Sequence, residues 1–137
     1  MQPTLQPLFI SVRGMSPAPA VPADQKAKER MWNWQRFVVQ ETRAKYDKSH
    51  MHGILLDTIF AVAIVFRLTP ANVRRIDLDN LAKPMLDALF RPNYQIPVDR
   101  GGALFDVDDA NVFKLTVEKI IVPNREEEGA DITITWE

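Results

Sequence analysis

An unbroken apolar run, Phe60-Ala61-Val62-Ala63-Ile64-Val65-Phe66, constrains the fold of this 137-residue chain more than any other feature. Side chains of a strand alternate between the two faces of its sheet, so a run without polar residues predicts a strand that is buried on both faces. Such a strand lies near the centre of a sheet. The wider apolar stretch from Ile54 to Phe66 contains Asp57 and is too short to span a bilayer. We therefore expect a globular protein built around this strand, with no membrane segment.

The residues before the run predict a strand, a loop and a helix. Leu5 to Val12 favours a strand that ends near Gly14, and the prolines of residues 15–22 favour an extended loop. Asp24 is a plausible N-cap for an amphipathic helix that runs to about Tyr46. The apolar face of this helix has the expected spacing of three and four residues, at Ala27, Met31, Trp34, Phe37 and Val38.

The residues after the run predict a second helix and two further strands. The segment from Asn80 to Phe90 is typical of a helix, and residues 91–104 of a surface loop. Two strands follow, at residues 111–122 and 131–136, and we expect them to pair antiparallel with each other. The order β-α-β-α-β-β predicts an α/β (α+β) fold over residues 1–137, with a mixed sheet covered by two helices.

Charge and cysteine content narrow the functions that the chain can have. It carries 17 basic and 18 acidic residues, so any surface for nucleic acid has to come from local clusters of Lys and Arg. The absence of cysteine excludes disulfides, thiol catalysis and thiolate metal sites. No basic stretch followed by an apolar run opens the sequence, so we expect a cytoplasmic protein without a signal peptide.

Two acidic clusters predict a metal site. Asp77 and Asp79 lie two residues apart, and Asp106-Val107-Asp108-Asp109 follows downstream. Crowded carboxylates raise one another's proton affinity unless a cation lies among them. Mg²⁺ prefers oxygen ligands and usually binds one or two carboxylates together with substrate phosphates. In an extended segment Asp77 and Asp79 would point to one side, so a junction between a strand and a helix would suit such a site.

Each of these residues also has a simpler interpretation. Asp79 has the residue type of a helix N-cap, and Asp108-Asp109 is typical of a solvated turn. Arg74 and Arg75, which precede the first acidic cluster, are typical of a solvated surface pair. Lys83 could bind a phosphate or pair with Asp79 or Asp87, four residues away on a helix.

The two clusters together resemble the motifs of the RusA family of Holliday junction resolvases. The first motif is Asp77-Leu78-Asp79-Asn80-Leu81-Ala82-Lys83-Pro84-Met85-Leu86-Asp87-Ala88-Leu89, and the second is Asp108-Asp109-Ala110-Asn111-Val112. The chain departs from the family in its Pro/Ala loop, which lacks a Ser-x-Asn-like motif, and in a longer connection between the motifs.

The resemblance implies an Mg²⁺-dependent endodeoxyribonuclease that resolves four-way (Holliday) DNA junctions in recombination and repair, with no organic cofactor. It implies that Asp77, Asp79 and Asp109 bind the metal, that Lys83 is the functional lysine and that the protein is a homodimer. We expect Arg74 and Arg75 to contact phosphates of the DNA, and the central strand and the apolar side of the first helix to contribute to the dimer interface. The alternatives are a non-catalytic protein that binds DNA junctions or replication forks, and an interaction module whose acidic pair only caps a helix.

Overall fold

The computed structural model describes residues 7–20, 24–46, 57–90 and 109–137, and it shows a mixed sheet with three helices. The elements are β1 (Leu8–Arg13), α1 (Gln25–Lys45), β2 (Phe60–Leu68), α2 (Pro70–Val73), α3 (Leu78–Leu89), β3 (Val112–Ile121) and β4 (Gly129–Trp136). Short 3₁₀ turns, η2 (Asp109–Asn111) and η3 (Arg125–Glu127), precede β3 and β4. The mixed α/β class and the predicted order of elements are confirmed, with the short helix α2 as an addition.

The sheet has the order β1-β4-β2-β3, which confirms β2 as an interior strand. β2 pairs parallel with β3 and antiparallel with β4, while β4 also pairs antiparallel with β1. The predicted pairing of the last two strands is therefore wrong. Ala130, Ile132 and Ile134 give β4 a fully buried face, which suits an interior position, whereas β3 exposes most of its side chains and forms an edge.

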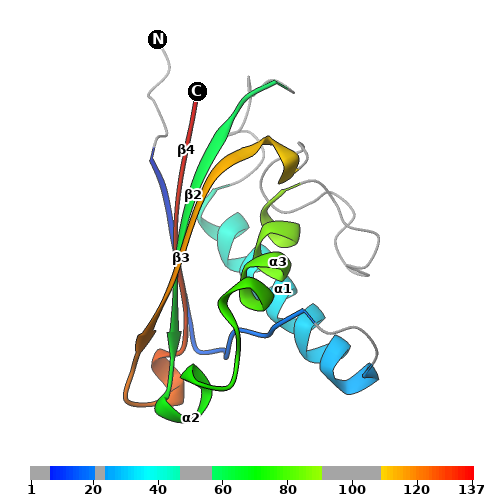
Figure 1. The fold of residues 1–137 in the computed structure, drawn as a ribbon, viewed down its shortest axis with the longest axis vertical. Helices are drawn as coiled ribbons and strands as arrows, with labels where there is room; N and C mark the ends of the chain where they lie inside the picture. Colours follow the sequence, from blue (N-terminus) through cyan, green and yellow to red (C-terminus); the bar gives the residue numbers. More distant parts are fainter. Residues whose placement is uncertain (1–6, 21–23, 47–56, 91–108) are drawn as a thin grey trace.

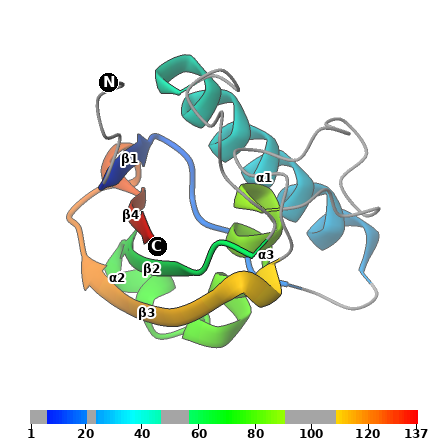
Figure 2. The ribbon, with the colours of Figure 1, turned by 90° about the horizontal axis from the view of Figure 1, so that it is seen from above.

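Both main helices lie on one face of the sheet, as Figures 1 and 2 show from two directions. Val62, Ile64 and Phe66 of β2 point toward these helices and are buried, while the alternate residues Ala61 and Ala63 are only partly buried. The prediction that β2 is buried on both faces is wrong. Its second face carries the partly buried Ala61, Ala63 and Val65 and the buried Arg67, and no described helix covers it (Figure 2).

The core lies between the sheet and the pair α1 and α3. Asp24 is the N-cap of α1, as predicted, and its carboxylate accepts a hydrogen bond from the amide of Lys26 at 3.0 Å. The core side chains of the two helices include Met31, Trp34, Val38, Leu81, Met85 and Leu89. The apolar side of α1 is thus used inside the subunit, so it cannot also form a subunit interface, and both edges of β2 are paired within the sheet. Among the described residues, no helix is long and apolar enough to cross a membrane.

A buried arginine of β2, Arg67, links β2 to β1 and β4 at one end of the sheet. Arg67 is 3% exposed, forms an ion pair with Asp131 and donates hydrogen bonds to the carbonyl oxygens of Val12 and Glu127. Gly129 lies at φ +157°, and a Cβ there would be 1.9 Å from the Val12 carbonyl oxygen. Only glycine tolerates this contact and this backbone conformation.

Candidate active site

The start of α3 places the first two predicted metal ligands. The helix begins at Leu78, so Asp77 occupies the N-cap position and Asp79 lies inside the first turn. The predicted helix start at Asn80 is wrong, as is the alternative in which Asp79 is the cap. Because Asp79 is already helical, the argument that both carboxylates project from one extended segment does not hold.

Both carboxylates are nevertheless available for a ligand. Asp77 has the extended backbone of an N-cap, but its side chain makes no capping hydrogen bond. Asp77 and Asp79 are exposed, and neither forms an ion pair or a side-chain hydrogen bond with another described residue. The helix dipole stabilises part of the negative charge of these two carboxylates, and a bound cation would relieve the repulsion that remains between them.

Lys83 joins the two sequence motifs in space. Its Nζ lies 3.1 Å from Oδ1 of Asp87, one helical turn onward, and 3.2 Å from Oδ2 of Asp109 in η2. Partial burial lowers the pKa of Lys83, but hydrogen bonds and charge attraction from Asp87 and Asp109 outweigh it and raise this pKa above its usual value. The predicted pair with Asp87 is confirmed, and the ammonium group is the cation that lies among these carboxylates.

A shallow groove between α3 and β3 contains part of this site. Its volume is about 480 Å³, and its wall is formed by Leu78, Asp79, Ala82, Lys83, Leu86, Leu115 and Val117. Asp79 and Lys83 are four residues apart and therefore lie on the same side of α3. The groove thus brings Asp79 and Lys83 together on one surface, with Asp109 in contact with Lys83.

Pro84 explains how the proline-rich loop is held against this helix. A proline has no amide hydrogen, so the carbonyl of Asn80, four residues earlier, has no intrahelical donor from position 84. The amide of Ala20 donates to the Asn80 carbonyl oxygen at 2.8 Å instead. The carbonyl oxygen of Pro84 accepts from the buried amide of Gln35 in α1 at 3.1 Å. The proline inside α3 is therefore a contact point for the loop and for α1.

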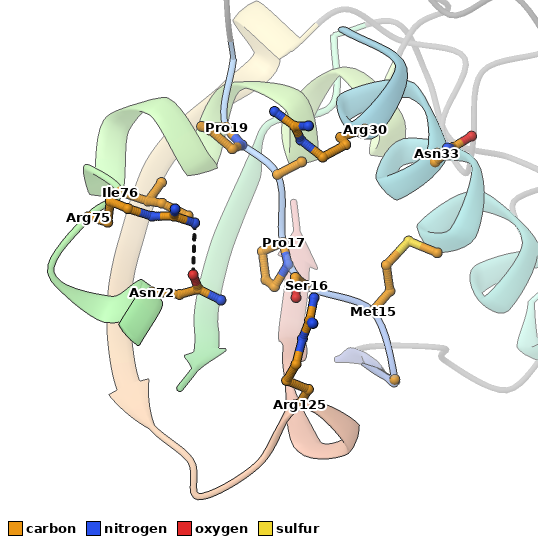
Figure 3. A pocket seen from close by; sticks show the side chains of 12 residues that line it. Met15, Ser16, Pro17, Pro19, Arg30, Asn33, Asn72, Arg75, Ile76 and Arg125 are labelled. Carbon is orange, nitrogen blue, oxygen red and sulfur yellow. Dashed lines mark hydrogen bonds between the residues drawn. The ribbon is translucent and has the colours of Figure 1, made fainter. Parts of the chain in front are cut away.

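The two predicted DNA-contacting arginines occupy different surroundings. Arg74 is the exposed C-cap residue of α2. Arg75 donates from Nη2 to Oδ1 of Asn72 at 2.9 Å and lines a second, larger pocket (Figure 3). Arg74 and Arg75 are therefore not equivalent, because only Arg75 lines this pocket.

The donor set suits a hard cation, although the described residues do not form a closed metal site. Carboxylates of the Asp77, Asp79 and Asp109 type are the ligands that Mg²⁺ takes in proteins. Within residues 7–20, 24–46, 57–90 and 109–137, no three acidic or histidine side chains gather around one point. Asp106, Asp108 and the predicted loop at 91–104 lie outside the described residues.

Glu128 is a central residue that the sequence does not single out. It is fully buried, and its carboxylate accepts hydrogen bonds from Ser16 Oγ, from Asn72 Nδ2 at 2.9 Å, and from the amide and hydroxyl of Thr69 at 2.8 and 3.0 Å. It thereby fixes the loop after β1 to the start of α2. In the sequence it follows Glu126 and Glu127, and nothing in the sequence distinguishes it from these two neighbours, neither of which is buried.

Two comparisons with known proteins find no match for this chain. A scan against protein-family models finds no matching family, and a search of curated proteins finds no matching protein.

Proposed function

We propose that this chain is a cytoplasmic, Mg²⁺-dependent endodeoxyribonuclease of the RusA type, and that it resolves four-way DNA junctions. The observation that carries this proposal is the 3.2 Å contact between Lys83 and Asp109. These residues belong to the two separate halves of the motif, and they are 26 positions apart in the sequence. A contact between the halves is what a shared active site requires, and a helix cap alone would not need it.

The described residues have distinct roles in the proposed reaction. Asp77, Asp79 and Asp109 would hold the metal, which supplies a more acidic water and neutralises charge that develops on the phosphate. The ammonium of Lys83 can exchange its contact with Asp109 for a phosphate oxygen of the DNA. Asp87 keeps this ammonium aligned, because its ion pair lies on the helix itself and does not depend on the DNA.

Cleavage of a synthetic four-way junction tests the proposal. We expect Mg²⁺-dependent cutting by the natural chain and a loss of orders of magnitude in Asp79→Asn, because the amide is a poor metal ligand. Since Asp79 is not the cap, this substitution removes only its interaction with the helix dipole, about 0.3–1 kcal/mol of stability.

Asp24→Asn is the matched control for this experiment. It removes the same charge from the N-terminus of α1 and keeps a capping side chain, so cutting should stay at the natural rate. Metal-dependent cutting by Asp79→Asn at the natural rate would contradict the assignment of Asp79. Junction binding without cutting in any divalent metal would favour the non-catalytic binding protein instead.

The proposed homodimer has a suitable surface at β3. This strand is an edge of the sheet, and it contains four of the five exposed large apolar side chains among the described residues: Phe113, Leu115, Ile120 and Ile121. A long apolar edge strand exposes unpaired backbone groups and readily pairs with another strand. Burial of this edge against a second copy would satisfy those groups and cover the apolar residues.

The sequence of β3 is complementary to itself in one antiparallel register. If the twofold axis passes Thr116, Lys114 of one copy faces Glu118 of the other, and Leu115 faces Val117. The register of β3 with β2 places Lys114 and Glu118 on the same face of the sheet, and Leu115 and Val117 on the face toward the helices. Opposite charges in directly facing positions stabilise a strand pair, and like charges destabilise it. An isologous pair of this kind would place both active sites on one face of the dimer.

A charge exchange tests this dimer independently of cleavage. Light scattering at micromolar concentration should give a dimer mass for the natural chain and a larger monomer fraction for Lys114→Glu. The double variant Lys114→Glu/Glu118→Lys should recover the dimer, because the facing charges are opposite again. A monomer mass for the natural chain, or a Lys114→Glu variant that dimerises as well as the natural chain, would refute the β3 interface.

A further inference from the structure

A second pocket of the described residues lies beside the candidate active site, at the end of the sheet where α2 begins. Its volume is about 720 Å³, within the range of sites that hold small ligands. The loop after β1, helix α1, the connection from α2 to α3 and the turn η3 all contribute to its wall (Figure 3). Arg75 and Ile76 line it and directly precede Asp77, so the pocket adjoins the acidic residues.

Three guanidinium groups from separate elements surround this pocket. Arg30 comes from α1, Arg75 from the connection before α3 and Arg125 from η3, and Figure 3 shows them around the same hollow. None of the three pairs with a carboxylate of the described chain. Glu128 accepts hydrogen bonds from two neutral residues of the wall, Ser16 and Asn72, and is itself buried. Uncompensated arginines around a concave surface attract phosphate, which they can bind through two parallel hydrogen bonds.

The rest of the wall provides apolar surface and neutral hydrogen-bonding groups. Met15, Pro17, Pro19 and Ile76 line the pocket, and Asn72 adds a side-chain amide that bonds Glu128 and Arg75. A flat apolar ring can pack against the apolar residues, and the second amide hydrogen of Asn72 can bond the edge of that ring. Phosphate, ring and polar edge are together the features of a nucleotide. Paired bases are held within the helical stack, so only an unpaired base can enter a pocket of this kind.

We propose that this pocket binds one phosphate-bearing nucleotide of an unpaired DNA strand. The assignment of DNA as the ligand rests on the proposed function. The pocket would take a nucleotide that is unstacked next to the cutting site, and it would thereby select branched DNA over continuous duplex.

Binding of a labelled single-stranded oligothymidylate in EDTA tests this, because no cleavage is needed for the signal. Arg30→Gln and Arg125→Gln should each weaken binding about tenfold or more, as expected for the loss of a charged hydrogen bond to phosphate. Lys26→Gln is the control, since Lys26 is an exposed cation on the same helix as Arg30 but does not line the pocket. It should change binding at most by the small, general effect of one charge. Thermal unfolding of each variant establishes that it is folded.

The other outcomes are also decisive. Unchanged binding by both arginine variants, or an equal loss in Lys26→Gln, would overturn the pocket. If thymidine monophosphate binds as tightly as the oligonucleotide, the ligand need not be part of a DNA strand, and that part of the proposal is refuted. If inorganic phosphate competes equally well, the pocket recognises phosphate alone, and the assignment of a nucleotide is refuted. Arginine-dependent binding without any metal-dependent cutting would support the pocket and refute the nuclease. Normal binding by the arginine variants in a chain that cuts junctions would refute the pocket alone.

Discussion

Replacement of the buried Glu128 by glutamine should lower stability in a way that depends on pH. Its Oε2 accepts three hydrogen bonds, from the amide and hydroxyl of Thr69 and from Asn72, while Oε1 accepts one from Ser16. Glutamine has the same shape, and its carbonyl oxygen can replace Oε2. Its NH₂ group then faces Ser16, whose hydroxyl can rotate to accept. All four contacts therefore survive, but without the negative charge.

The loss of charge sets the size of the effect. A hydrogen bond to a charged group contributes about 1.5–3 kcal/mol and a neutral one about 0.5–1.5, so each contact weakens by about 1 kcal/mol. The neutral amide is less costly to bury, which returns part of the loss. We expect the free energy of unfolding to fall by about 2–3 kcal/mol near neutral pH. The melting temperature should then fall by about 10 °C.

The pH dependence separates this effect from a simple packing defect. Burial alone raises the pKa of Glu128, but hydrogen bonds from Ser16, Thr69 and Asn72 outweigh it and hold this pKa below the usual 4.5. A carboxyl with a depressed pKa in the folded state stabilises the protein above its unfolded pKa, and this contribution disappears as the pH falls through the folded value. The difference between the natural chain and Glu128→Gln should therefore be largest above about pH 5 and shrink below pH 4.5.

Urea unfolding of both proteins over this pH range measures the difference. Other acidic groups titrate in both chains, so the subtraction isolates Glu128. A gap that stays constant down to the lowest pH would show that the ionised carboxylate contributes nothing, and the reasoning would fail.

Three further predictions concern the site and the fold. Lys83→Gln should slow single-turnover cutting about a hundredfold or more, the usual effect of removing one group that stabilises charge at a reacting centre. If the variant cuts at the natural rate, Lys83 has no role in the reaction besides its ion pairs. Gly129→Ala should lower the free energy of unfolding by about 2–5 kcal/mol, because it adds both backbone strain and overpacking. The control Gly14→Ala also has positive φ but open space around it, so urea unfolding should show a smaller loss of about 1–2 kcal/mol. Arg74→Ala and Arg75→Ala should each flatten the salt dependence of junction binding by about one phosphate contact. Unchanged slopes would show that DNA binds to another part of the surface.

Local patterns in the sequence were sufficient to place most elements. The N-cap Asp24, the helix that follows it and the strand at residues 60–68 each depend on neighbouring residues, so spacing and composition could identify them. The start of α3 was misplaced by two residues, because Asp77 and Asp79 are both suitable caps and nothing local distinguishes them.

The strand order could not be read in the same way. The segments 112–121 and 129–136 have similar patterns, and adjacent strands in a chain commonly pair as a hairpin. The choice of β4 for the interior depends on how Ile132 packs against Ile10 and Ile64 at once, which is a property of the assembled sheet.

The site was predictable only where one motif contained it. Asp77, Asp79 and Lys83 share one helix start, and their resemblance to a known motif also indicated Asp109. No sequence motif indicates Arg30, Arg125 or Glu128. Each lies among other charged residues in the sequence, and its role depends on residues that are distant in the sequence.

The interior position of β4 also determines when this protein can fold during its synthesis. Ser11 of β1 bonds to Asp131 of β4, 120 residues later, and β4 separates β1 from β2. Until the ribosome has released residues 129–136, β1 has no neighbour, and β2 presents one apolar edge to other nascent chains. Such long-range pairing folds slowly and exposes intermediates to aggregation. Deletion of residues 129–136 would therefore remove the strand that holds β1 to the rest of the sheet.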